Sequence, residues 1–171
     1  MIDFTKLDYL KEGNSRQKRA FEILKKYKIF EKMKYYSPIL AGTIPIEIDI
    51  EGSDLDIICE VKDKVEFKEL LNDIFREYSN FKIREDVINN ENCIILNVFL
   101  DDFEIEIFGQ NKPTIQQNAY RHMIAEYKIL QEKGEGFKQK IIDLKKQGIK
   151  TEAAFGMLLG LENPYEDLLK F

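Results

Sequence analysis

Apolar residues recur at helical spacing in the N-terminal part of the chain, directly after the helix-capping residues Asn14 and Ser15. This periodicity predicts one amphipathic helix over residues 15–34. A second stretch of helical spacing covers residues 64–78. From Pro113 to the C-terminus the pattern is helical again, so the last third of the chain is predicted to be a group of helices.

Between these helical stretches the pattern changes to the alternation of apolar and polar residues that is typical of strands. A short apolar run at 39–41 and an irregular segment at 44–53 precede a predicted strand at 54–61. Three more strands are predicted at about 81–88, 93–100 and 103–108. Asn89–Asn90 and Asp101–Asp102 lie between them in turn positions. The sequence therefore predicts an α/β (α+β) fold with a small mixed sheet flanked by helices.

The length of 171 residues fits one domain. The change of pattern near Pro113 divides it into an α/β core at 1–112 and a helical C-terminal region at 113–171. We expect the helical region to pack on the core, so that the two parts form a single compact unit.

The charge balance is acidic, with a net charge of −5 and 33% charged residues. Contacts with phosphates need cations, so an acidic chain is a poor binder of long nucleic acids. The lysines between Lys25 and Lys34 are clustered, but a solvated helix face is the favoured interpretation of that cluster. A small molecule, a protein or an RNA end is therefore the expected class of partner, and a homodimer stays open.

The chain has no stretch of ~20 apolar residues that could span a bilayer, and its first residues lack the pattern of a secretory signal. Cys59 and Cys93 both lie in apolar, strand-like runs. Two cysteines form neither a disulfide framework nor a complete zinc site. We expect two buried thiols in a protein of the cytoplasm, with no membrane partner.

Two aspartates carry the most informative pattern. On a strand, Asp54 and Asp56 would point to one face about 6.5–7 Å apart, with Leu55 and Ile57 on the opposite face toward the core. Two like charges at that separation are unfavourable unless a cation neutralises them. Mg²⁺ accepts a few carboxylates together with water and substrate phosphates. Solvated acids at the end of a strand are the alternative interpretation.

A third acid is available on the last predicted strand. Phe103, Ile105 and Ile107 would form one face of that strand, and Glu104 and Glu106 the other. If the strand pairs beside 54–61, either glutamate completes a site of three carboxylates. Such a site can hold two metal ions that activate an attacking oxygen and stabilise a leaving phosphate.

The combination of Gly42-Thr43, about ten further residues and then Asp54-Leu55-Asp56 resembles the motif of the nucleotidyltransferase superfamily, which has the polymerase-beta-like fold. That motif is an apolar residue, Gly-Ser, about ten residues and Asp-apolar-Asp, with a third acid on a later strand. The runs Glu106–Gln110 and Ala119–Met123 are also similar to those of small bacterial members of the superfamily. The resemblance covers most of the chain.

The resemblance implies that Asp54, Asp56 and Glu106 are catalytic and bind Mg²⁺ or Mn²⁺. Glu106 is preferred to Glu104 because, in polymerase-like relatives with two acids on this strand, the second acid is the catalytic one. It further implies a nucleoside triphosphate, such as ATP, as substrate. The expected nucleotide contacts are Gly42, Thr43, Ser53 and Arg121. Thr43 stands where the superfamily usually has Ser, and Glu106 stands where Asp is commoner.

Two helix residues keep alternative interpretations. His122, the single histidine, is favoured as a packed, hydrogen-bonded residue over a catalytic base. Arg121 could bind a phosphate through its forked guanidinium group, or form a salt bridge with an acid such as Glu126.

The resemblance therefore implies a metal-dependent nucleotidyltransferase that moves a nucleoside monophosphate from a triphosphate to an unknown acceptor. One alternative is a catalytically silent module of the same fold that binds a nucleotide or a protein, in an antitoxin-like or regulatory role. Another retains the metal ions but transfers pyrophosphate or hydrolyses a phosphoester. One fold hosts many functions, so the fold is the firmer of the two expectations.

Overall fold

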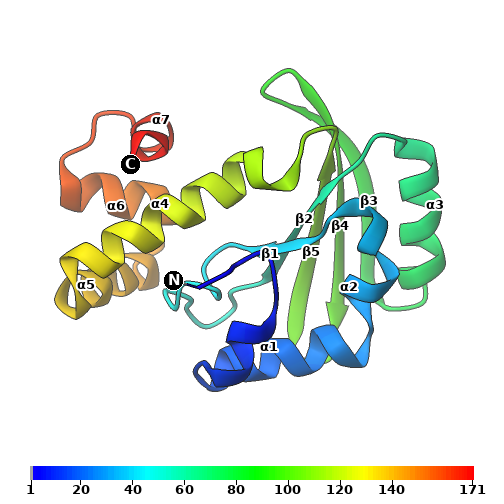
Figure 1. Ribbon diagram of the computed structural model, residues 1–171, viewed down its shortest axis with the longest axis horizontal. Helices are drawn as coiled ribbons and strands as arrows, with labels where there is room; N and C mark the ends of the chain where they lie inside the picture. Colours follow the sequence, from blue (N-terminus) through cyan, green and yellow to red (C-terminus); the bar gives the residue numbers. More distant parts are fainter. Residues whose placement is uncertain (1) are drawn as a thin grey trace.

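A five-stranded mixed sheet forms the centre of the structure, a computed structural model that describes residues 2–171 (Figure 1). The strands are β1 (Ile39–Ala41), β2 (Leu55–Glu60), β3 (Ser79–Ile88), β4 (Glu91–Leu100) and β5 (Phe103–Gln110). They lie in the order β1-β2-β5-β4-β3. The pair β2–β5 is parallel and the other three pairs are antiparallel. The predicted mixed α/β sheet is therefore confirmed, with strand ends that differ by up to two residues.

The hairpins of the sheet turn where the sequence predicted them. Asn89 and Asn90 join β3 to β4 with φ angles of 52° and 62°, and Asp101 joins β4 to β5 with a φ of 51°. Positive φ angles at both central residues match the twist of a two-residue hairpin, and asparagine tolerates them better than most residues. The β3–β4 tip rises beyond the other strands at the end of the sheet where α4 begins (Figure 1).

The predicted continuous helix over 15–34 is wrong. Helix α1 (Ser15–Lys26) begins with a reciprocal capping box between Asn14 and Gln17, but Lys28 has a φ of 53°, which breaks the helix. The chain then forms the short helix α2 (Ile29–Lys32) and the 3₁₀ turn η2 (Lys34–Tyr36). Because of this break, both Ile29 and Met33 are buried in the core. A straight helix would place these two side chains differently.

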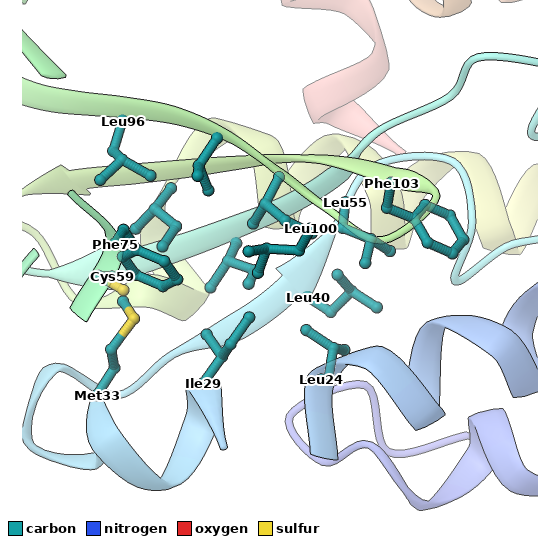
Figure 2. Close-up of a cluster of buried hydrophobic side chains, with 14 of the residues drawn as sticks. Leu24, Ile29, Met33, Leu40, Leu55, Cys59, Phe75, Leu96, Leu100 and Phe103 are labelled. Atoms are coloured by element: carbon teal, nitrogen blue, oxygen red, sulfur yellow. The ribbon is translucent and has the colours of Figure 1, made fainter. Parts of the chain in front are cut away.

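One hydrophobic cluster fills the space between the sheet and the N-terminal helices. Helix α3 (Lys64–Phe75) packs on the same side, ending three residues before its predicted end. Figure 2 shows Leu24 beside Leu40, and Met33 pointing toward Cys59. The alternate residues of β2 and β5 that were predicted to face the core do so, since Leu55, Ile57, Cys59, Phe103, Ile105 and Ile107 are all fully buried.

The last third of the chain is helical, as predicted. It contains η3 (Thr114–Gln116), α4 (Asn118–Lys133), α5 (Glu135–Lys146), α6 (Thr151–Leu159), α7 (Pro164–Asp167) and η4 (Leu168–Lys170). A second hydrophobic cluster joins these helices to the other face of the sheet, with Ile39 and Ile58 against Met123, Ile141 and Phe155. The proposed division of the chain at residues 112 and 113 stays a prediction.

Among residues 2–171, no helix combines the length and the apolar character needed to cross a membrane. The two cysteines are both buried and free, as expected. Burial raises the pKa of the Cys59 thiol far above its ordinary value.

Candidate active site

Two acids, Asp56 and Glu106, lie side by side on neighbouring strands of the sheet. In the parallel pair β2–β5, Asp56 is the register partner of Glu106. Their neighbours Leu55 and Ile105 are buried in the first hydrophobic cluster, so the alternation of each strand turns both acids to the opposite face. The sequence analysis required that the strand with the third acid pairs beside the strand with the aspartates. The pairing of β5 with β2 meets this condition.

Gly42 follows β1 directly and lies behind this pair. Ala41, the last residue of β1, is the register partner of Asp56, and Gly42 continues from it with a φ of 80°. A Cβ atom on Gly42 would overlap the carboxylate oxygen Oδ2 of Asp56. Glycine is therefore required here both for the backbone angle and for the space beside the acid.

The loop after Gly42 is held in place from helix α1. The buried Gln17 side chain donates from Nε2 to the carbonyl oxygens of Ile44 and Pro45, at 3.0 and 3.2 Å. The Thr43 carbonyl accepts from the backbone N–H of Ile48 at 3.1 Å. Its side-chain hydroxyl makes no hydrogen bond within residues 2–171 and lines the adjacent cleft. The Gly42–Thr43 backbone therefore has a fixed position beside the carboxylates.

The electrostatics of the pair favour neutralisation. Burial, followed by the charges of Asp54 and Glu106, raises the pKa of Asp56 to about 8. Burial also raises the pKa of Glu106, although Asn97 Nδ2 donates to its Oε2 at 3.3 Å and opposes that shift. A cation that binds beside these two carboxyl groups stabilises their charged forms. Binding of a cation to the pair is therefore favoured.

The two candidates for the third acid differ in environment. Glu106 is half-buried and lines the cleft, whereas Glu104 is exposed. Both glutamates lie near the Asn97 amide, with Glu104 at the longer distance of 3.4 Å. The position of Glu106 beside Asp56 fits the preferred assignment, which stays a prediction.

The other residues singled out in the sequence differ in their relation to the pair. Asp54 precedes β2 and is half-buried, close enough that its charge acts on Asp56. The Ser53 hydroxyl oxygen accepts from the Ile50 backbone N–H at 2.9 Å and shapes the preceding loop. Arg121 is exposed on α4 and is not one of the residues that line the cleft. Roles for these three residues in nucleotide or metal binding stay predictions.

A cleft of about 460 Å³ opens in front of the carboxylates; we call it the central cleft. Gly42, Thr43, Asp56 and Glu106 line its sheet end. Its opposite end lies between α4 and α6, and the β3–β4 tip overhangs its side with Ile88 and Asn89. This volume is in the range of sites for small molecules and cofactors.

The helix end of the central cleft contains ionisable residues that the sequence analysis did not assign to a site. His122 Nε2 lies 2.8 Å from the Tyr165 carbonyl oxygen, and Nδ1 lies 3.6 Å from Glu152 Oε1. Burial acts to lower the pKa of His122, but the hydrogen bonds to Glu152 and Tyr165 raise it above the ordinary value. This environment agrees with the packed, hydrogen-bonded histidine that was favoured.

Glu126 lies one helical turn beyond His122 and is only 4% exposed. Burial and the nearby Glu152 raise the pKa of Glu126 to about 8. The alternative salt bridge between Arg121 and Glu126 is absent from the part of the chain that the structure describes. One signal in the sequence could have marked this residue: an acid stands among Met123, Ile129 and Leu130 on the apolar side of the helix.

The donor set at the sheet end fits a hard divalent cation such as Mg²⁺ or Mn²⁺. Its groups are the carboxylate oxygens of Asp56 and Glu106, which are the ligand atoms that these cations prefer. Within residues 2–171, no three His, Cys, Asp or Glu side chains are grouped closely enough to hold a metal ion by themselves. A Mg²⁺ site that is completed by substrate phosphates needs fewer protein ligands than such a group.

The chain belongs to the family described as Domain of unknown function (DUF4269), whose model matches residues 22–171. No curated protein sequence matches the chain significantly. The matched region therefore contains the whole sheet and all the C-terminal helices. The description of the family names no activity.

Several solved structures of low sequence identity have a similar fold. The Cid1 poly(U) polymerase bound to MgATP superimposes with a TM-score of 0.56 at 14% identity, over 90% of this chain and 53% of that one. The GLD-2/RNP-8 complex gives 0.54 at 12% identity, over 89% and 60%. A cytoplasmic RNA terminal U-transferase gives 0.50 at 14% identity, over 83% and 43%. The chain thus spans about half of those chains, and the fold resembles a nucleotidyltransferase core.

Proposed function

We propose that this protein is a metal-dependent nucleotidyltransferase, which moves a nucleoside monophosphate from a nucleoside triphosphate to a hydroxyl group of an acceptor. The observation that carries the proposal is the register pairing of Asp56 with Glu106 beside the side-chain-free backbone of Gly42. Two opposed acids with disfavoured charges have little structural benefit. Binding of a triphosphate with its metal ion would explain why the two acids lie next to each other.

Asp54, Asp56 and Glu106 would hold Mg²⁺ or Mn²⁺. When bound, the metal ion would neutralise the triphosphate and lower the pKa of an attacking hydroxyl group. Gly42 and Thr43 would bring backbone N–H groups and one hydroxyl group to the phosphates, since both residues line the central cleft. Ser53 would support the loop before Asp54 through its hydrogen bond with Ile50.

In the transfer step, the acceptor oxygen attacks the α-phosphorus of the triphosphate. A new P–O bond forms to the acceptor, the P–O bond to the β-phosphate breaks, and pyrophosphate leaves with the electron pair. The proton of the acceptor hydroxyl passes toward the Glu106 carboxylate, which lines the cleft beside Asp56. The protein contributes mainly positioning and compensation of charge.

The likeness to solved polymerases supports the fold part of this proposal. Titles of those structures name Mg 3'-dATP, MgATP and MgGTP as ligands of Cid1 poly(U) polymerase. At 12–14% identity the likeness carries no information about the acceptor of this chain. The acidic net charge and the small central cleft favour a small acceptor over a long RNA.

A catalytically silent module that binds a nucleotide or a protein is the second candidate function. It would be favoured if the protein bound nucleotides without metal, because the three acids would then have no role. Transfer of pyrophosphate or hydrolysis of a phosphoester would use the same residues and would differ only in the products.

Calorimetric titration of each nucleoside triphosphate with Mg²⁺ tests the proposal, with native protein and an Asp54→Asn/Asp56→Asn double variant. We expect binding by the native protein and loss of binding, by at least about 100-fold, in the variant. A Glu51→Gln variant is a matched control, because Glu51 lies exposed in the loop before Asp54. Absence of binding by native protein at millimolar nucleotide with Mg²⁺ or Mn²⁺ would refute the transferase.

A further inference from the structure

Two buried oxygen atoms that lack a hydrogen-bond donor belong to residues of the central cleft. Within residues 2–171, the buried side-chain atoms without a partner are Tyr9 Oη, Arg16 Nε, Glu91 Oε2 and Gln117 Oε1. Glu91 and Gln117 both line the central cleft, and so does Lys112. We call these three residues the tip side, because Glu91 begins β4 directly after the β3–β4 tip. Native proteins seldom leave a buried oxygen without a donor, so a donor from outside the chain is expected here.

The side-chain amide of Gln117 is fixed in one orientation. Gln117 is 1% exposed, and its Nε2 donates to the carbonyl oxygens of Cys59 and Lys112, at 2.9 and 3.0 Å. Because a carbonyl oxygen can only accept, the amide nitrogen must face these two atoms. Both protons of the amide are then used, and Oε1 is left as an acceptor. Gln117 therefore offers a ligand an acceptor in a fixed place and no donor.

Glu91 and Lys112 determine the charge that fits this side of the cleft. Glu91 Oε1 lies 2.9 Å from Lys112 Nζ, so the two charges compensate each other. The second carboxylate oxygen, Oε2, still has no donor. The missing partner is therefore a neutral group with N–H donors, since a further cation is not needed. The ammonium group of Lys112 has two more protons, which an acceptor of the same ligand can use.

The polar face of β5 connects the carboxylates with the tip side. Glu106, Phe108 and Gln110 lie on that face and line the central cleft, and Lys112 follows two residues later. The four residue steps from Glu106 to Gln110 span about 13 Å of extended strand. A nucleotide extends over a similar length from its α-phosphate to the far edge of its base. The half-buried ring of Phe108 lies between the two ends and offers a surface on which a base can stack.

We propose that the tip side selects guanine, and that GTP is therefore the preferred substrate of the central cleft. Glu91 Oε2 and Gln117 Oε1 accept from the N1–H group and the exocyclic amine of the base, and Lys112 donates to O6. This inference rests on the proposed function for the triphosphate and its metal ion, whereas recognition of the base depends on neither.

The chemistry of the four bases supports this assignment. The tip side offers two acceptors and one donor, so it needs a base edge with two donors and one acceptor. Guanine alone has two adjacent N–H donors beside a carbonyl oxygen. Adenine and cytosine place a ring acceptor next to their amine, and uracil has one donor between two acceptors. A site built to bind an N–H group rejects an analogue that lacks it, because its own polar atoms then stay unpaired.

The experiment is a calorimetric titration of the full chain with GTP, ITP and ATP in the presence of Mg²⁺. ITP differs from GTP only by the absence of the exocyclic amine, so the pair isolates one donor. We expect GTP to bind at least about tenfold more tightly than ITP and than ATP. Equal affinity for the three nucleotides would overturn the proposal.

Two variants assign the selectivity to the tip side. Glu91→Gln removes the carboxylate and should weaken GTP binding at least about tenfold, while ATP, which does not present the two donors, should bind as before. A merely structural role of Glu91 would weaken both nucleotides equally, and that result would overturn the proposal. Glu132→Gln, at an exposed position of α4, should change neither affinity. Thermal unfolding verifies that both variants fold.

A titration with guanosine and inosine, without metal ion or phosphate, separates this inference from the proposed transferase. The readout is the shift of the backbone amide signals of Gln110 and Gln117 in NMR spectra. Preference for guanosine together with no binding of GTP and Mg²⁺ would support the base subsite and refute the transferase. Binding of all triphosphates without preference for guanine would refute the subsite and leave the transferase intact. Absence of binding by every nucleotide and nucleoside would refute both.

Discussion

The backbone of Gly42 lies against the carboxylate of Asp56, so closely that a methyl group on Gly42 would overlap Oδ2. The contact joins the end of β1 to the acid on β2, and it depends on a φ of 80° at the glycine. Glycine meets both conditions without strain because it has no Cβ. The backbone conformation of Gly42 therefore helps to determine the position of Asp56, a candidate metal ligand.

The Gly42→Ala substitution should therefore affect both stability and binding. We expect a loss of about 1–2 kcal/mol in the free energy of unfolding from backbone strain, with a further loss from displacement of Asp56. Binding of a triphosphate with Mg²⁺ should weaken at least about tenfold, because the displaced Asp56 carboxylate would no longer lie beside Glu106. Denaturant unfolding and calorimetry measure the two effects.

Gly52 offers a matched control for that substitution. Its φ is 84°, but a Cβ there would have no atom within 4 Å. Gly52→Ala should show the backbone strain without the loss of binding. If both variants bind nucleotide equally well, the contact between Gly42 and Asp56 has no role in the site.

Gln17 should hold the loop beside the active site in place. Its side chain is 2% exposed, donates to the carbonyls of Ile44 and Pro45, and accepts from the Asn14 backbone N–H at 3.0 Å. Gln17→Ala leaves these groups without partners, which should cost about 2–3 kcal/mol of the free energy of unfolding. Lys18→Ala, at an exposed position of the same helix, should cost less than about 0.5 kcal/mol. Equal unfolding midpoints for the two variants would contradict this role.

Glu126 should make the stability of the protein depend on pH. Its pKa is raised to about 8 in the folded protein from an ordinary value of 4.5, because burial disfavours the charged form. The folded state then binds more protons than the unfolded state between these two values. The contribution of Glu126 to the free energy of unfolding should be highest below about pH 4.5, fall as the pH rises, and level off above about pH 8.

Glu126→Gln removes this contribution, so its stability should fall less between pH 5 and pH 8 than that of the native protein. The difference has an upper limit of about 1.4 kcal/mol for each unit by which the pKa is raised. Denaturant unfolding at a series of pH values measures it. Glu132→Gln should follow the native curve, since Glu132 is exposed. Parallel curves for native protein and Glu126→Gln would show that Glu126 is ionised in the folded state.

The pattern of the sequence predicted the sheet well because strand alternation depends on local residues. Leu55, Ile57 and Ile105 are apolar at every second position, and burial of one face requires that pattern. The break at Lys28 escaped prediction because lysine is a good helix former, and only packing of Ile29 and Met33 on the core explains the turn.

The candidate site was predictable only in part for a similar reason. Asp56 and Glu106 are fifty residues apart, but each lies on a strand whose polar face could be read from the sequence. The meeting of Glu126 with Glu152 depends on how α4 packs against α6, which no local pattern specifies. Helix packing is determined by side chains across the whole surface of each helix.

The most direct test of the account is a titration of Mn²⁺ into the protein followed by electron paramagnetic resonance, with and without a nonhydrolysable triphosphate analogue. A metal site shared by Asp56 and Glu106 should bind Mn²⁺ weakly by itself and strongly in the presence of the analogue. Asp56→Asn and Glu106→Gln should each weaken the strong binding at least about tenfold, and Glu104→Gln should not. Strong binding that survives both substitutions, or no Mn²⁺ binding in the presence of the analogue, would contradict a metal site shared by Asp56 and Glu106.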